Sequence, residues 1–244
     1  LFVRGPRAGQ GPRVQELRAQ WKALQESGES VDFGMISHGF EILRCQSSCI
    51  WRYIDNPVCL LPKECFVLIP RQPVPALQVS TLAHGAFDLS ADAPERATLV
   101  VFYRGLHCPI CQKYLLELGR LLPEFGRRGV KVVALSSDTQ ERAQAMADKL
   151  NAPDLRVGYG LSLTVARVWS LYVSAGRGLT SIGLEEPALF SEPGVFIVQA
   201  DGTLYYGAVQ TMPFARPHFD ELLGAMDFAI AKDYPARGEY TGSV

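Results

Sequence analysis

From residue 68 onward, β-forming segments alternate with segments of helical period, and glycines or prolines separate them. The strand at 97–103 is almost continuously apolar, as expected of a strand that is buried on both faces. The helix that follows contains Pro123, which we expect to bend or end it. Strands are predicted at 78–82, 86–89, 97–103, 130–136, 155–159, 194–198 and 203–206, and helices at 109–125, 138–150, 162–172 and 217–230.

This order of elements indicates an α/β fold. Strands that alternate with helices favour a helix-covered, mostly parallel sheet, and the turn Ala200-Asp201-Gly202 adds an antiparallel hairpin at an edge. Residues 174–192 are rich in glycine and serine and are predicted to form a loop. Ser137 or Asp138 is the expected cap of the second helix, with Glu141 completing a capping box.

Residues 1–67 have a different character. An amphipathic helix is plausible from Val14 to Glu26, but the glycines after it break every period. We expect this region to be an N-terminal extension that is disordered or not natively translated, with translation starting near Val67 or Leu68. The folded domain is then residues 68–244.

Composition narrows the class of function. Hydrophobic residues make up 48% of the chain, so it can bury a full core. The net charge of −1, without blocks of like charge, argues against nucleic acid or an anionic membrane as partner. No apolar run approaches the roughly 20 residues of a membrane helix, and the first residues lack a secretory pattern, so we expect a cytoplasmic protein.

The chemistry centres on a Cys-x-x-Cys pair, Cys108 and Cys111, at a predicted strand-to-helix junction. The first turn of a helix carries unpaired N–H groups and partial positive charge, which stabilise a thiolate. Zinc binding and two inert cysteines are alternatives, but residues 68–244 offer no second Cys/His pair. The redox interpretation makes Cys108 the attacking thiolate and Cys111 the cysteine that resolves the intermediate.

The block Val100-Val101-Phe102-Tyr103-Arg104-Gly105-x-x-Cys108-Pro109-x-Cys111 resembles the alkyl hydroperoxide reductase/thiol-specific antioxidant family, the peroxiredoxin-like branch of the thioredoxin superfamily. The resemblance implies a thioredoxin-like fold, with a central mixed β-sheet flanked by helices and a peroxiredoxin-type insertion within 137–191. It also implies substrate-binding positions at Gly105, Pro109 and Pro193.

The chain departs from that family at two of these positions. Gly105 stands where peroxiredoxins have a peroxide-orienting threonine, and Pro193 stands where they have an arginine. Pro193 instead resembles the cis-proline of thioredoxins, with an ordinary trans loop proline as the alternative.

Neighbouring side chains have more than one interpretation each. Arg104 could supply the missing positive charge or be a solvated strand-end arginine. His107 could lower the thiol pKa, shuttle a proton, or be a packed neutral imidazole. We expect solvated loop charge for three glutamates, with a base near Cys108 as the alternative: Glu185, Glu186 and Glu192. We expect core packing for three aromatic residues, with lining of the cleft as the alternative: Trp169, Tyr172 and Phe190.

We therefore expect a thiol-dependent oxidoreductase that reduces hydrogen peroxide or organic hydroperoxides. A thioredoxin-like protein disulfide oxidoreductase and a non-enzymatic redox sensor are the alternatives. The expected partners are a peroxide or disulfide substrate, a thioredoxin-like or glutathione-type reductant, and a second copy in a homodimer. No cofactor or metal is expected, because the cysteines carry the electrons and the N-terminal spacing Cys45-x3-Cys49 matches no zinc knuckle.

Overall fold

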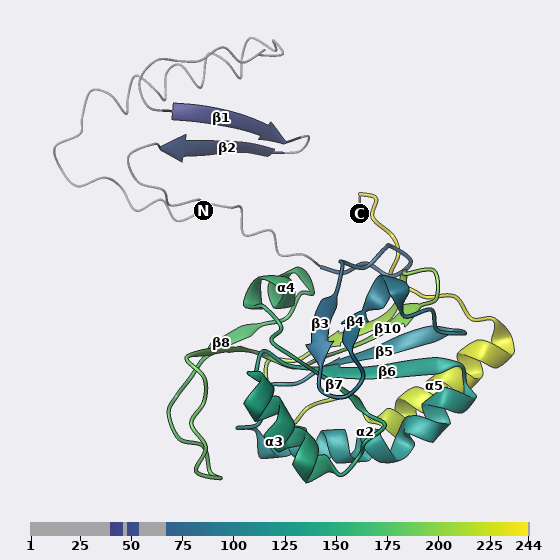
Figure 1. Cartoon of the computed structure of the whole chain (residues 1–244). Coiled ribbons are helices and arrows are strands. Elements are labelled where there is room, and N and C mark those ends of the chain that lie inside the picture. Colours follow the sequence, from purple (N-terminus) through teal and green to yellow (C-terminus); the bar gives the residue numbers. More distant parts are fainter. Residues whose placement is uncertain (1–39, 46–47, 54–66, 244) are drawn as a thin grey trace. The chain divides into compact units, whose positions relative to one another are not determined.

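The computed structural model describes residues 40–45, 48–53 and 67–243 and divides the chain into two units, Leu1–Glu64 and Cys65–Val244. In the first unit, β1 (Phe40–Cys45) and β2 (Ser48–Tyr53) form an antiparallel pair (Figure 1). The sequence showed no clear period there, so this hairpin was missed. The predicted helix Val14–Glu26 lies outside the described residues, and the natural start of the chain stays a prediction.

The second unit is built on a seven-stranded mixed sheet of order β11-β10-β5-β6-β7-β3-β4. In this sheet β5 pairs with β6 in parallel, and β6 pairs with β7 in parallel. Every other pairing in this sheet is antiparallel. The strands are β3 (Gln78–Thr81), β4 (Ala86–Asp88), β5 (Ala97–Phe102), β6 (Val130–Leu135), β7 (Arg156–Tyr159), β10 (Gly194–Gln199) and β11 (Leu204–Val209).

The predicted mixed sheet is thus confirmed, but the expectation of a mostly parallel one was wrong. The hairpins β3–β4 and β10–β11 form the two edges of the sheet. Each is antiparallel, because a short turn can join only antiparallel strands. Periodicity along one strand specifies its buried face but not its direction relative to a neighbour.

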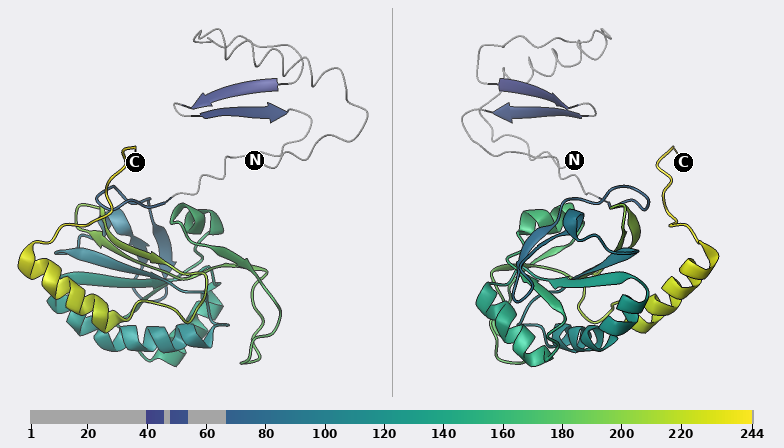
Figure 2. Two further views of the ribbon diagram at one scale, coloured as in Figure 1. Left: turned by 180° about the vertical axis from the view of Figure 1, so that it is seen from behind. Right: turned by 45° about the vertical axis from the view of Figure 1, so that its right-hand side comes forward.

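Helices cover the sheet on two faces (Figures 1 and 2). One face carries α2 (Pro109–Arg127), α3 (Gln140–Leu150) and α5 (Phe219–Lys232), and the other carries the short α4 (Leu163–Val168). Alternate side chains of β5 serve the two cores, with Leu99 on the α2 side and Val100 on the α4 side. The remaining elements are η1 (Leu89–Ala91) and the strands β8 (Val173–Ala175) and β9 (Leu189–Ser191).

Three segments differ most from the predictions. Helix α2 continues through Pro123 to Arg127, because buried Leu118 and Phe125 on either side of the proline pack into the same core. The predicted helix 162–172 is helical only at Leu163–Val168. The predicted loop 174–192 contains most of the antiparallel pair β8–β9, whose register joins residues 14 to 18 positions apart.

None of the helices in the described part of the chain combines the length and apolar character that a membrane crossing requires.

Candidate functional site

Cys108 occupies the N-cap of α2, directly after the turn that leaves β5. Its backbone is extended (φ −105°, ψ 103°), and Pro109 stands at the first helical position, where a missing N–H costs nothing. The side chain is only 2% exposed. A hydrogen bond from the Cys111 side chain, supported by the backbone N–H of Cys111 and by the charges of Arg216 and Arg104, lowers the pKa of Cys108 to about 6. Cys108 is therefore mostly thiolate at pH 7.

Cys111 lies one turn further into α2 and is completely buried. Burial raises the pKa of Cys111 well above its ordinary value, and the adjacent Cys108 raises it further, while Arg216 opposes both effects. The two thiols are free in this structure. The pair thus consists of an acidic sulfur at the helix end and a protonated one behind it, as nucleophile and resolver require.

Arg216 is the cation nearest to the pair, and the sequence did not identify it. Its Nη2 donates to Cys111 Sγ at 3.0 Å, and its guanidinium lies 5.0 Å from the centre of the Tyr114 ring. Tyr114 also anchors the segment, because its hydroxyl donates to Pro217 O at 2.6 Å. Within the described chain, Arg216 Nε and Nη1 are buried without a hydrogen-bond partner.

Gly105 has a structural role that explains the departure from threonine at this position. Its φ of +136° is open only to glycine, and a Cβ would lie 2.7 Å from Asp138 Oδ2. That carboxylate is buried, accepts from the Leu106 N–H at 2.7 Å, and pairs with Arg142 Nε at 2.9 Å. Asp138 thereby ties the turn before Cys108 to α3. The predicted cap was wrong, since Thr139 caps α3 instead.

Arg104 lies in a network of charges. Its Nε is 3.2 Å from Glu192 Oε2, its Nη2 is 3.3 Å from Glu186 Oε1, and its guanidinium covers the Phe190 ring at 4.6 Å. Glu192 is itself buried and accepts from Ser174 Oγ at 2.6 Å. The expectations of a solvated Arg104, Glu186 and Glu192 were wrong, because the β8–β9 pair brings both carboxylates back over the end of β5.

His107 is fully buried and lies against the Phe190 ring, with centroids 4.7 Å apart. Burial, aided by the positive charge of Arg104, lowers the pKa of His107 to about 4. The imidazole is neutral at pH 7, which among the interpretations of His107 favours the packed neutral imidazole over one whose charge acidifies Cys108. Arg142 Nη2 lies 3.5 Å from Nδ1, which leaves the hydrogen on Nε2.

Pro193 is buried beside the site, but the cis-proline prediction was wrong. No cis peptide bond occurs in the described residues. The Glu192 N–H donates to Tyr172 O at 2.8 Å and the Gln210 N–H donates to Pro193 O at 3.0 Å, so this segment runs as extended backbone. Trp169 and Phe190 are buried in or beside the core, as predicted, whereas Tyr172 is 53% exposed.

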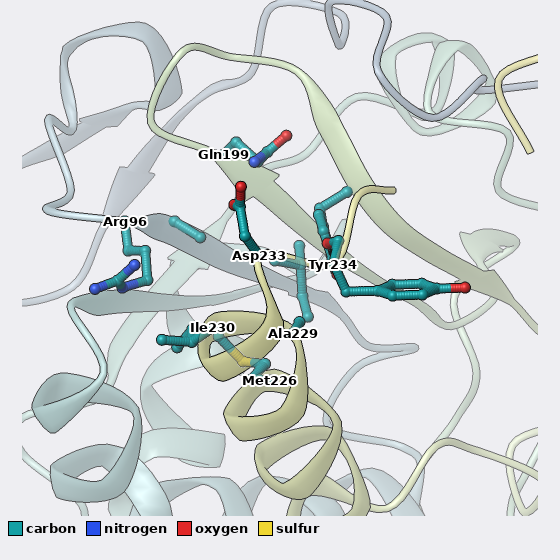
Figure 3. A pocket seen from close by; sticks show the side chains of 10 residues that line it. Arg96, Gln199, Met226, Ala229, Ile230, Asp233 and Tyr234 are labelled. Carbon is teal, nitrogen blue, oxygen red and sulfur yellow. Dashed lines mark hydrogen bonds between the residues drawn. The ribbon is translucent and has the colours of Figure 1, made fainter. Parts of the chain in front are cut away.

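A separate pocket lies between the end of α5 and the sheet (Figure 3). Arg96, Asp233 and Tyr234 border its mouth and Met226 its floor. Because Ala97 begins β5 and Cys108 follows the opposite end of that strand, the pocket is separated from the cysteines by roughly 17 Å of strand. It is not part of the redox site.

Comparison with known proteins finds relatives of this chain. The family model described as "AhpC/TSA family" matches residues 70–207. A 1-Cys peroxiredoxin of Onchocerca volvulus is 29% identical over 127 residues, which cover 49% of this chain and 54% of that protein. The chain thus matches about half the length of this relative.

Solved structures share the fold at low sequence identity. Peroxidoxin BcpB from Mycobacterium tuberculosis has a TM-score of 0.52 at 18% identity, covering 66% of this chain and 98% of that one. A mutant of peroxiredoxin 6 from Arenicola marina has a TM-score of 0.56 at 16% identity, covering 68% and 76%. The thioredoxin-like α/β fold of the prediction is confirmed.

Proposed function

This chain belongs to the AhpC/TSA family, and on that premise we propose that it is a thiol peroxidase in which Cys108 attacks the peroxide and Cys111 resolves the product. The observation that carries the proposal is the Cys108 thiol, which combines a pKa of about 6 with 2% exposure at a helix N-terminus. A thiolate this acidic is nucleophilic at neutral pH. A thiol this deeply placed suits a small peroxide better than a disulfide on another protein.

The proposed reaction has three steps. The Cys108 thiolate attacks the terminal oxygen of ROOH, the O–O bond breaks and the sulfur is oxidised to sulfenic acid, while the RO⁻ leaving group takes one proton from solvent and departs as ROH. Cys111 then attacks that sulfur, a disulfide forms, and water leaves. An external thiol reductant supplies two electrons and returns both cysteines to thiols.

Arg216 is the cation that serves this chemistry in the proposal. Arg104 is paired with two carboxylates, whereas Arg216 touches Cys111 and keeps two buried nitrogens without a partner among the described residues. A guanidinium there stabilises negative charge on either sulfur. In this proposal Arg216 supplies the positive charge for which Arg104 was the candidate in the sequence. Gly105 contributes no hydroxyl group to the site, because the Asp138 carboxylate occupies the space that a side chain at position 105 would need.

The curated relative is a 1-Cys peroxiredoxin, so the proposal that Cys111 resolves the product depends on the geometry of this chain. Cys111 donates its hydrogen bond to Cys108, which places the two sulfurs in contact. The redox-active disulfide, the cytoplasmic location and the homodimer stay predictions.

The test is stopped-flow reaction of the reduced full chain with hydrogen peroxide, compared with free cysteine corrected for its thiolate fraction. We expect a rate orders of magnitude above free cysteine and a product that has lost two hydrogens. Cys108→Ser should abolish the fast phase. Cys111→Ser, whose hydroxyl can still donate to Cys108, should react quickly and stop at sulfenic acid. A wild-type rate near that of free cysteine would refute peroxidase activity and favour disulfide exchange or sensing.

A further inference from the structure

A groove lies along the exposed side of α2, and one of its lining residues, Arg216, contacts Cys111. It has a volume of about 350 Å³, within the range of small-molecule sites. One wall is a face of α2 with helical spacing, and the other is the linker before α5. The residues that matter below are Lys113, Glu117, Arg120, Phe214, Arg216 and His218.

Arg216 connects this groove to the redox pair. It lines the groove, and its Nη2 lies 3.0 Å from Cys111 Sγ. Its Nε and Nη1 are buried and unpartnered within the described part of the chain. A molecule bound in the groove therefore lies next to whichever disulfide Cys111 forms.

The groove carries charged side chains of both signs. Lys113 and Arg120 are exposed, and neither has an ion-pair partner among the described residues. They are seven residues apart on α2, about 10 Å along the helix axis, which is the span of an extended tripeptide. Between them, ligand atoms of Glu117, His218 and Asp220 lie within 4.8 Å of one another, which provides negative charge. This pattern complements a molecule with two carboxylates and one ammonium group.

We infer that this groove binds the reductant, and that the reductant is a small peptide thiol with two carboxylates and an ammonium group. The inference rests on the proposed Cys108–Cys111 disulfide. The thiolate of the reductant attacks Cys108 Sγ, the Cys108–Cys111 bond breaks, and Cys111 leaves as a thiolate beside Arg216. A second reductant molecule attacks the mixed disulfide, forms its own disulfide and frees the Cys108 thiolate.

The test uses the full chain oxidised with diamide, so it does not require peroxidase activity. Peptide mapping locates the disulfide, and alkylation quench measures its reduction by glutathione and by glutathione diethyl ester, each corrected for thiolate fraction. The double variant Lys113→Gln/Arg120→Gln removes the groove cations. Lys149→Gln/Lys232→Gln is the matched control, because it removes two exposed lysines of α3 and α5 that line none of the pockets described.

We expect wild type to prefer glutathione over its ester, and the groove variant to lose roughly fourfold of that preference, since each of the two exposed ion pairs contributes a factor of about two. The control should keep the preference. An unchanged ratio in the groove variant, an equal fall in the control, a Cys108–Cys111 disulfide that does not form, or reduction only by a thioredoxin-like protein would overturn the inference. The separate peroxide assay reports on the proposed function, so the two failures are distinguishable.

Discussion

Replacing Arg216 by methionine tests the cation beside the resolving cysteine. The change removes the guanidinium that donates to Cys111 Sγ at 3.0 Å but keeps an unbranched side chain against Tyr114. Burial already holds the pKa of Cys111 high, and losing Arg216 raises it further. We therefore expect the step from sulfenic acid to disulfide to slow, because fewer Cys111 thiols ionise.

The magnitude follows from the strength of that contact. A hydrogen bond to a charged group contributes roughly 1.5–3 kcal/mol, which is about a 10- to 100-fold change in thiolate population. The Cys111 thiolate that remains is more basic and therefore more nucleophilic. With a Brønsted slope of about 0.4–0.5, this higher nucleophilicity recovers nearly half of the lost rate on a logarithmic scale. The expected slowing of disulfide formation is about 3- to 15-fold.

The assay is stopped flow at pH 8 with trapping of the Cys108 sulfenic acid, which separates oxidation from resolution. At this pH Cys108, with its pKa of about 6, is almost fully ionised, so a moderate rise in its pKa leaves the oxidation step nearly unchanged. Arg216→Lys keeps the charge and should lie between wild type and Arg216→Met, and thermal unfolding checks that each variant folds. Resolution at the wild-type rate in Arg216→Met would refute the assignment.

Three further predictions concern the surroundings of Cys108. Gly105→Ala should destabilise the fold by roughly 2–4 kcal/mol in denaturant unfolding, because a Cβ meets the Asp138 carboxylate at positive φ, whereas Gly224→Ala on exposed α5 should stabilise slightly; equal effects would contradict this reasoning. His107, with its pKa lowered to about 4 in the fold and about 6.5 unfolded, takes up a proton first in the unfolded chain, so stability is lost as pH falls below 6.5. Between pH 7.5 and 5 this amounts to about 2 kcal/mol, and His107→Asn should lose less stability over that interval; an identical pH dependence would contradict it. Glu186→Gln frees Arg104 from one carboxylate and should move the alkylation midpoint of Cys108 below its value of about 6 by a few tenths of a pH unit, while Arg104→Met should move it upward; shifts of the same sign would argue against Arg104 as a source of the low pKa.

Much of the fold and the reactive cysteine follow from local sequence. The apolar run before Arg104, the helical period after Cys108 and the hairpin signal at Asp201-Gly202 each lie within about ten residues, so periodicity and turn chemistry reveal them. The same proximity places Cys108 at a helix end and Cys111 one turn behind it, and these two positions imply which sulfur is acidic. The family match of residues 70–207 agrees with the fold.

The environment of those cysteines was decided only by the tertiary structure. Arg216 is 105 residues away from the sulfur it touches, and Glu186 lies 82 residues from Arg104, so no local pattern pairs them. The direction of β10, the β8–β9 pair and the neutral state of His107 also depend on which elements pack together. A sequence specifies side chains and local conformation directly, whereas charge, burial and contact between distant segments exist only after the chain has folded.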